Sequence, residues 1–467
     1  MDTLTTTTSE VAKFGGTSMA APEQVVAQLE YSSDATPVVV CSAPGLDKEH
    51  GYYTKVTDML RSDDPAITEL LQARYALMAR RLDPSETDHA LQQVVADIPH
   101  DLERWRSYGW PVAGLGEYWS ARMLAAHTGR EFVDATEIIR FDENGQLDEA
   151  TSSALIKERL LPGRKYVVPG YYGARHDGQI ELLERGGSDI TGALIARALE
   201  ADEYHNWSDV PGFMTADPNV LPQSLEQMLQ VITYQEARDL GIGGSELLHR
   251  EASRILLGTA VSTVMRNTFG RLGNRGTRIE NTRDFLNTPV VGVTGSMAVG
   301  LSTRKFGRLN EEVGGIDAVL QPLKERGISL GQVVTGVDNT AVYVPIANPG
   351  KSDEAFAEYQ SMIADISEVA ELIDGEHDIW LAGMVHIIGE GIARSGIARA
   401  QMMGQLGMKF ADVGISLEGF VDARDSATAT AFIEIDQSTD PAYAIGSVQR
   451  ALAVAHNAVL GFERYPI

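Results

Sequence analysis

The sequence predicts an α/β protein of two or three domains. A chain of 467 residues is too long for one ordinary hydrophobic core. The apolar run 37–42 leads into the loop 43–45, as a buried parallel strand does. Beyond residue 290 a β-α-β-β order of segments occurs twice, which is ferredoxin-like. Hydrophobic content of 43% and charged content of 22% suit a soluble globular α/β protein.

Composition argues against several kinds of partner. The formal net charge of −26 would repel nucleic acids and anionic membrane surfaces. The single cysteine, Cys41, excludes an internal disulfide and a cysteine metal cluster, and suits a reducing cytosol. Residues 1–9 are polar and threonine-rich, so we expect a disordered leader there. Since no apolar run has the length of a membrane span, we expect a cytoplasmic protein.

The first informative stretch is residues 11–18 (VAKFGGTS). It has the pattern of an apolar strand that carries Lys13 and runs into Gly15, Gly16 and two hydroxyl residues. Glycines let backbone N–H groups approach an anion, and the lysine adds a compact positive charge, so the stretch indicates a phosphate site. It is not a Walker loop, in which the lysine follows the glycines. The alternative is a tight glycine turn beside a solvated lysine.

The next segments predict helices and strands around this stretch. Residues 63–107 carry leucine and alanine at helical spacing and predict a helical hairpin that covers the sheet. Residues 116–122 begin another helix, where Glu117 either complements the helix dipole or holds a ligand. Residues 165–170 predict a strand, and Tyr171 in the loop behind it either lines the site or packs in the core.

A second anion site is predicted at residues 183–191 (LERGGSDIT). Two glycines followed by Ser, Asp and Thr before an apolar helix form a backbone nest at a helix N-terminus. Arg185 can hold a carboxylate at two points, and Asp189 either caps the helix or takes part in the site. Residues 263–268 predict the final strand of this domain, and the polar residues 281–289 predict a boundary.

The later part of this domain lacks lysine. No lysine occurs between Lys165 and Lys305, so phosphates bound there need arginine, a metal or backbone donors. The candidate arginines are Arg250, Arg254, Arg266 and Arg275. The two repeats that follow have expected first strands at 290–294 and 384–389, helices at 316–326 and 396–406, and further strands within 328–344 and 415–435.

Taken together, these motifs resemble those of the aspartate kinases in the amino acid kinase family, over nearly the whole chain. The stretches that carry the resemblance are KFGGTS (13–18), SAPG (42–45), KVTD (55–58), GEYWSA (116–121), ERGGSDIT (184–191) and WSDVPGFMTADP (207–218). The resemblance implies a three-layer αβα sandwich, the amino acid kinase domain, followed by two ferredoxin-like (βαββαβ) ACT domains. The implied limits are 1–9 for the leader, 10–283 for the catalytic domain, and 284–375 and 376–467 for the ACT domains.

The resemblance also implies roles for individual residues. The implied catalytic residues are Lys13, Gly15, Gly16 and Asp189. The implied substrate residues are Ser42, Ala43, Glu117, Arg185 and Ser188. The implied nucleotide residues are Thr17, Ser18, Ser208, Asp209, Phe213, Met214 and Asp217. Gly314, Gly315, Gln332 and Asp338 lie where an effector would bind at the seam of the ACT domains, although ordinary turn chemistry explains them almost as well. No protein ligand of a metal is identified.

The implied reaction transfers the γ-phosphoryl group of ATP, with Mg²⁺, to the β-carboxylate of L-aspartate. The product is 4-phospho-L-aspartate, and the step opens the route to lysine, threonine and methionine. ACT domains imply inhibition by an amino acid such as lysine or threonine. Because such domains pair at their edges, a homodimer or a higher homo-oligomer is expected.

Several positions depart from the family pattern. Glu184 replaces a glycine, Met214 and Asn219 stand where a tyrosine and an arginine are usual, and Glu246 replaces a lysine. One branch of the family also lacks that lysine and has an H-x-E-A tetrad, which residues 249–252 match. Two alternatives therefore stay open. One is another amino-acid or carbamate kinase of the same fold, and the other is a catalytically silent amino-acid sensor.

Overall fold

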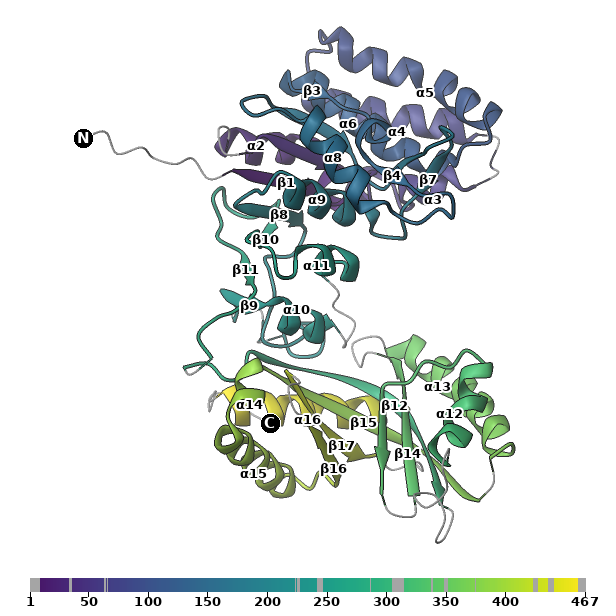
Figure 1. Ribbon diagram of the computed structural model, residues 1–467, viewed down its shortest axis with the longest axis vertical. Coiled ribbons are helices and arrows are strands. Elements are labelled where there is room, and N and C mark those ends of the chain that lie inside the picture. The colour runs from purple at the N-terminus through teal and green to yellow at the C-terminus, as the bar shows by residue number, and fades with distance from the viewer. Residues whose placement is uncertain are drawn as a thin grey trace, which may run out of the picture. The chain divides into compact units, whose positions relative to one another are not determined.

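The computed structural model divides the chain into two compact units (Figure 1). Unit 1 comprises residues 1–213, 230–234 and 247–283, and unit 2 comprises residues 214–229, 235–246 and 284–467. The structure describes residues 9–32, 36–62, 64, 66–222, 224, 227–241, 247–285, 287–304, 315–336, 339–347, 352–373, 375–422, 427–435 and 441–460. The expected leader therefore lies almost entirely outside the described residues. Among these residues, no helix is long and apolar enough to cross a membrane.

Unit 1 contains an eight-stranded sheet that is parallel except between β10 and β11. In spatial order its strands are β3 (Glu131–Phe132), β5 (Tyr166–Pro169), β2 (Val38–Cys41), β1 (Glu10–Phe14), β8 (Glu203–Ser208), β10 (Ser262–Asn267), β11 (Thr277–Glu280) and β9 (Val231–Thr233). Strands β1, β2 and β5 are buried along their whole length, as the apolar runs predict.

Helices cover both faces of this sheet. Successive residues of a strand point to opposite faces, and in β1 Ala12 and Phe14 share a core cluster with Ala121 of α6, whereas Lys13 contacts Asp189 of α9. On the α6 side lie α2 (Pro22–Tyr31), α4 (Ile67–Leu82), α5 (His89–Ser107) and α6 (Leu115–Thr128) (Figure 1). On the α9 side lie α8 (Glu149–Arg159), α9 (Gly187–Ala198) and α11 (Arg250–Leu256). The predicted sandwich and the predicted helical hairpin, α4 and α5, are thus confirmed.

Short elements account for the differences from the expected order. The last strand is not 263–268, because β11 returns antiparallel beside β10 after a turn in which Gly276 has φ +61°. A small sheet of β4 (Arg140–Phe141), β6 (Tyr172–Arg175) and β7 (Ile180–Leu182) was not expected. The remaining short helices are α1 (Gly16–Met19), α3 (Val56–Leu60), α7 (Ala135–Ile138) and α10 (Tyr234–Leu240), with 3-10 turns at Lys48–His50 and Val112–Gly114. Strands of two to four residues carry too little pattern for the sequence to reveal.

Unit 2 holds both repeats in a single six-stranded antiparallel sheet. In spatial order its strands are β13 (Gln332–Thr335), β14 (Asn339–Ala347), β12 (Gly292–Arg304), β15 (Glu376–Ile388), β17 (Thr428–Glu434) and β16 (Leu417–Asp422). Its helices are α12 (Gly315–Glu325), α13 (Ser352–Ala370), α14 (Glu390–Arg394), α15 (Gly396–Asp412) and α16 (Pro441–Leu460). The β-α-β-β rhythm of each repeat is confirmed.

The two repeats share their central strands and one core. β12 and β15 have 13 residues each and pair along their full length (Figure 1). A ferredoxin-like sheet has four strands, and each repeat supplies three of its own. β15 takes the place of the fourth strand in the sheet of the first repeat, and β12 does so in the sheet of the second. Tyr343 and Phe432, from equivalent strands of the two repeats, stack with ring centroids 4.0 Å apart beside buried Ala298 and Ala382. Both central strands are longer than expected. The predicted domain limits stay predictions.

Candidate active site

A cavity of about 360 Å³ lies at the carboxyl ends of β1, β2 and β5 in unit 1. In open α/β sheets, ligand sites form at this end of the strands. Its lining comes from the loops behind those strands, from the first turns of α6 and α9, and from the α3 region. The lining residues are Lys13, Gly16, Thr17, Ser42, Ala43, Pro44, Gly45, Lys55, Thr57, Asp58, Arg61, Glu117, Tyr171, Arg185, Gly186, Gly187, Ser188 and Asp189.

Lys13 is held in the cavity by an ion pair. Its Nζ lies 2.5 Å from Oδ1 of Asp189, and each side chain is 11% exposed. Asn206 on the neighbouring strand accepts a weaker bond from the same Nζ at 3.4 Å, and Oδ2 of Asp189 accepts the backbone N–H of His249 at 3.3 Å. Because its partner comes from the first turn of α9, the ammonium group is fixed between two strand-end loops.

Glycines allow the loops of the cavity to approach one another. The N–H of Gly45 donates to the carbonyl of Gly16 at 2.7 Å, and a Cβ on Gly45 would lie 2.8 Å from the carbonyl carbon of Gly16. Gly186, directly before α9, has φ +89°, a conformation that favours glycine. The first residues of α1 and of α9 therefore line the same cavity.

Gly15 and Ser18 do not line this cavity. The N–H of Gly15 donates to the carbonyl of Trp207 at 2.9 Å, and a Cβ at this position would lie 3.5 Å from Nζ of Lys13. The tighter contact of such a Cβ would be with the carbonyl oxygen of Trp207, at 3.3 Å. The buried hydroxyl of Ser18 lies 2.7 Å from the hydroxyl of Thr268, which fastens α1 to the end of β10.

Glu117 places a buried carboxyl group in the cavity wall. It is 5% exposed in the first turn of α6 and accepts a bond from the backbone N–H of Ala43. Burial raises the pKa of Glu117 to about 8, and its Oε2 is buried without a hydrogen-bond partner. An unpaired buried carboxylate oxygen is costly, so this atom is suited to a cationic group of a ligand.

The other predicted residues fall into three groups. Thr17, Ser42, Ala43, Arg185 and Ser188 line the cavity together with Lys13, Gly16, Glu117 and Asp189. Ser208, Asp209 and Phe213 belong to unit 1 but not to the cavity lining; the N–H of Phe213 donates to Oγ1 of Thr277 at 2.9 Å. Met214 and Asp217 belong to unit 2, where Met214 forms a bridge with Met228.

Of the predicted effector residues, Gly315 begins α12 and Gln332 begins β13 in unit 2. Gly314, Asp338 and the departing residue Glu246 lie outside the described residues. Lys55, Thr57, Asp58 and Arg61 line the cavity without having been predicted as site residues. The KVTD motif at 55–58 was a signal for the first three, whereas nothing in the sequence pointed to Arg61.

The candidate arginines have other partners. Arg254 pairs with Glu149 and Glu251, and Arg266 donates to the carbonyl of Asn274 at 2.9 Å. Neither residue, nor Arg250 or Arg275, lines the cavity. His249 caps α11 by accepting the N–H of Glu251 at 3.2 Å, which is a structural role.

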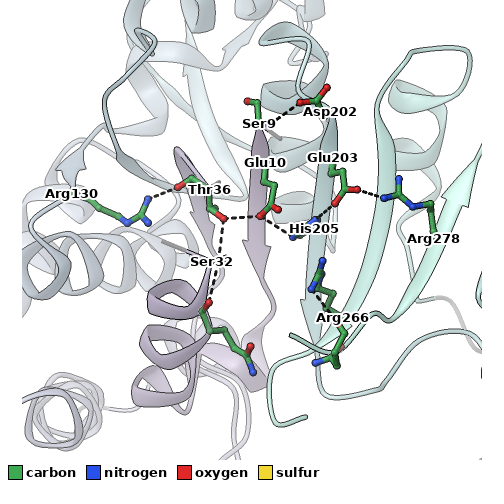
Figure 2. Close-up of polar contacts among 12 residues, drawn as sticks. Ser9, Glu10, Ser32, Thr36, Arg130, Asp202, Glu203, His205, Arg266 and Arg278 are labelled. Carbon is green, nitrogen blue, oxygen red and sulfur yellow. Dashed lines mark hydrogen bonds and ion pairs between the residues drawn. The ribbon is translucent and has the colours of Figure 1, made fainter. Parts of the chain in front are cut away.

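A histidine between two glutamates lies at the amino ends of β1 and β8 (Figure 2). In His205, Nε2 is 2.6 Å from Oε2 of Glu203, and Nδ1 is 3.4 Å from Oε2 of Glu10. Arg278 pairs with Glu203, and the guanidinium of Arg266 interacts favourably with both carboxylates. Two arginines supply the positive charge that a metal ion would bring, so this cluster is an ion-pair network of the sheet.

The fold and the cavity together define an α/β enzyme of the small-molecule kinase type, with a fixed lysine, glycine-rich loops, and a buried carboxyl oxygen that has no hydrogen-bond partner. The amino acid kinase family pattern matches residues 10–267, and the chain belongs to that family. The sequence is similar to Aspartokinase 3 of Bacillus subtilis (strain 168), with 30% identity over 412 residues, which span 82% of this chain and 87% of that protein.

Solved structures agree with this assignment. The crystal structure of Clostridium acetobutylicum aspartate kinase is similar with a TM-score of 0.77 and 26% identity, over 95% of this chain and 100% of that chain. E. coli aspartokinase III in complex with aspartate and ADP matches with a TM-score of 0.65 over 95% of this chain and 100% of that chain. At 19% identity, this second likeness shows the fold alone. The resemblance seen in the sequence motifs is therefore confirmed.

Proposed function

We propose that this protein is an aspartate kinase, which transfers the γ-phosphoryl group of ATP to the β-carboxylate of L-aspartate and releases 4-phospho-L-aspartate and ADP. The observation that carries the proposal is the meeting of the Lys13–Asp189 pair and the buried Glu117 in one cavity. The lysine suits a phosphoryl group, and the carboxylate suits an α-ammonium group. The similar E. coli structure holds aspartate and ADP.

The reaction needs positioning and charge compensation more than a base. The acceptor carboxylate is ionised at neutral pH, so it attacks phosphorus without losing a proton. Lys13 and the amides of Gly16 and the α9 first turn stabilise the negative charge that spreads over the moving phosphoryl oxygens. Asp189 orients Lys13 through their ion pair.

The acceptor is proposed to be held at both ends. Arg185 binds its α-carboxylate through two N–H groups, and Glu117 binds its α-ammonium group. Ser42 and Ser188 add neutral donors. This places the β-carboxylate toward Lys13 and in line with the leaving ADP oxygen.

The nucleotide is proposed to lie beside Thr17, with Ser18, Ser208, Asp209, Phe213, Met214 and Asp217 on its side as the family motif implies. Mg²⁺ in kinases takes most of its ligands from phosphate oxygens and water, and one or two from carboxylates. Asp189 and the exposed Asp58 are the cavity carboxylates that fit such a role, because Glu117 is too deeply buried. When bound, the ion would neutralise phosphate charge.

Unit 2 is proposed to sense an end-product amino acid such as lysine or threonine. The support is its pair of ferredoxin-like repeats and the family resemblance. We also propose the domain limits 10–283, 284–375 and 376–467, a homodimeric or larger assembly, and a cytoplasmic location.

A coupled ADP-release assay with L-aspartate, L-glutamate and N-acetyl-L-glutamate tests the proposal. Turnover with aspartate alone is expected. Turnover that favours another acceptor would assign a different kinase activity. Absence of turnover with all three, together with saturable lysine or threonine binding, would indicate the silent sensor that Met214, Asn219 and Glu246 keep under consideration.

A further inference from the structure

Tyr171 has an unusual backbone conformation at the cavity. Its φ is +76°, which a side chain with a Cβ rarely adopts, and the residue is 6% exposed. The conformation is held from both sides, since Thr191 Oγ1 accepts the Tyr171 N–H at 3.3 Å and the Tyr171 carbonyl accepts the Leu183 N–H at 2.8 Å. Strain of this kind is costly and tends to persist at functional sites.

The Tyr171 hydroxyl anchors Arg61. It accepts a bond from Nη2 of Arg61 at 2.8 Å, and both residues line the cavity. Arg61 directly follows α3 and is otherwise exposed to solvent. The tyrosine therefore ties an exposed, permanently charged side chain to the cavity wall.

Three buried neutral side chains contribute to the electrostatic surroundings of Glu117. Cys41 of β2, Tyr75 of α4 and Tyr172 of β6 interact electrostatically with Glu117, and burial raises the pKa of each well above neutral pH. Burial likewise raises the pKa of Tyr171. Among the described residues, Arg61 is the cation that acts to lower the pKa of Glu117, against the larger effect of burial.

We propose that Arg61, held on the Tyr171 hydroxyl, is a positioning residue that directs positive potential toward Glu117 while leaving that carboxyl group open to the ammonium group of the amino-acid acceptor. A guanidinium free to move would fold onto the buried carboxylate and close the ammonium position. Without the guanidinium, the protonated form of Glu117 would be favoured still more, and the group would ionise only at a higher pH. The tether avoids both outcomes, because it supplies positive potential from the mouth of the cavity. This inference rests on the proposed function.

The test uses the full-length protein and the variants Arg61→Gln and Tyr171→Phe. Both are expected to raise KM for aspartate by about 3- to 10-fold, with kcat and KM for ATP changed less than about twofold. For Arg61→Gln, the pH at which aspartate binding reaches half its maximum should rise by about 0.5–1 unit. Arg61→Lys keeps the charge and should restore the pH profile in part. Arg80→Gln, on the exposed end of α4, removes the same charge away from the cavity and should change nothing.

Circular dichroism and melting temperature establish that each variant is folded. The double variant Arg61→Gln, Glu117→Gln separates the two explanations. If Arg61 has a merely structural role, Arg61→Gln should raise KM for aspartate by the same factor in the Glu117→Gln background as in wild type. If Arg61 acts through Glu117, it should raise KM no further in that background. Unchanged KM and an unchanged pH profile in both single variants would overturn the proposal. Wild-type protein that turns over no amino acid would instead refute the proposed function. In that case isothermal titration calorimetry with aspartate and the same variants still measures how Arg61 and Tyr171 affect aspartate binding.

Discussion

At the scale of single residues, Lys13 is expected to matter more for turnover than for folding. Lys13→Ala should lower kcat by about 10²- to 10³-fold, because it removes a fixed positive charge from the moving phosphoryl group. It also leaves Asp189 unpaired, so some loss of stability is expected. Steady-state kinetics and chemical denaturation measure the two effects.

Two further variants separate these effects. In Lys13→Met combined with Asp189→Asn, neither side chain is charged, so stability should recover while turnover stays low. Lys157→Ala breaks an exposed pair with Glu200 and should leave both properties within error of wild type. Near-normal turnover in folded Lys13→Ala protein would contradict the mechanism.

The raised pKa of Glu117 predicts a pH-dependent KM. Below its pKa of about 8 the carboxyl group is mostly protonated and cannot attract an ammonium group. KM for aspartate should therefore fall by up to about tenfold per pH unit as pH rises from 6.5 toward 8, while kcat changes little. Glu117→Gln should have a high KM with no such slope. A wild-type KM independent of pH in this range would contradict the assignment of Glu117.

Stability should change with pH in the opposite sense. A carboxyl group whose pKa is raised in the folded state contributes stability below its unfolded pKa, near 4.5, and loses that contribution as pH rises through about 8. Glu117→Gln, which stays neutral, should therefore be more stable than wild type at alkaline pH. Urea denaturation at pH 6 and pH 8.5 measures the difference. The buried carboxyl group of Glu117 is thus both the proposed ligand-binding group and a group that lowers stability at alkaline pH.

At the scale of elements, the network at the amino ends of β1 and β8 predicts acid sensitivity of the sheet (Figure 2). The hydrogen bond from His205, aided by Arg278, lowers the pKa of Glu203 to about 2. The stability that this provides is present above the unfolded pKa, near 4.5, and is lost as pH falls through 2. Glu203→Gln should cost about 1–3 kcal/mol at pH 7, and the cost should shrink toward pH 3.

Glu280→Gln is the matched control for this variant. Glu280 also pairs with Arg278, at 3.7 Å, but its side chain is 37% exposed. Its substitution should change the free energy of unfolding by less than about 1 kcal/mol at either pH. An equal cost for both substitutions, or a cost for Glu203→Gln that does not depend on pH, would contradict the network's role.

Elements with strong local patterns were predictable from the sequence, and elements fixed by distant contacts were not. Buried apolar runs identified β1, β2 and β5, and helical spacing identified α4 and α5. The central part of β12, GSMAVG, has no alternation of apolar and polar residues, because every residue in it is buried. Gly300 must be small, since a Cβ there would lie 2.4 Å from the ring of Trp380 on β15, a partner 80 positions away.

The same division applies to the cavity. Lys13, Glu117, Arg185, Ser188 and Asp189 stand in contiguous motifs, so their meeting was expected, and the structure brings them together. Arg61 has no motif of its own. Its importance arises from a hydrogen bond to a residue 110 positions later, whose strained backbone only the fold reveals.

At the scale of the whole molecule, the shared sheet predicts that the two repeats of unit 2 respond to a perturbation together. One core cluster contains Val299 of β12, Val344 of β14, Ile433 of β17 and Val448 of α16. Val448→Ala, in the second repeat, should cost about 1–3 kcal/mol because it opens a cavity in that core. Hydrogen exchange of amides should then speed up in β14 of the first repeat as well as in β17.

Val94→Ala, in the core of unit 1 on α5, is the control and should leave the exchange of unit 2 unchanged. Loss of protection confined to the second repeat would mean that the repeats open separately despite their common strands. Joint loss has a consequence for regulation: an amino acid that binds one repeat and stabilises it must also stabilise the other, since β12 and β15 are paired along their full length. Effector binding would then be measured as one cooperative change across both repeats rather than as two independent ones.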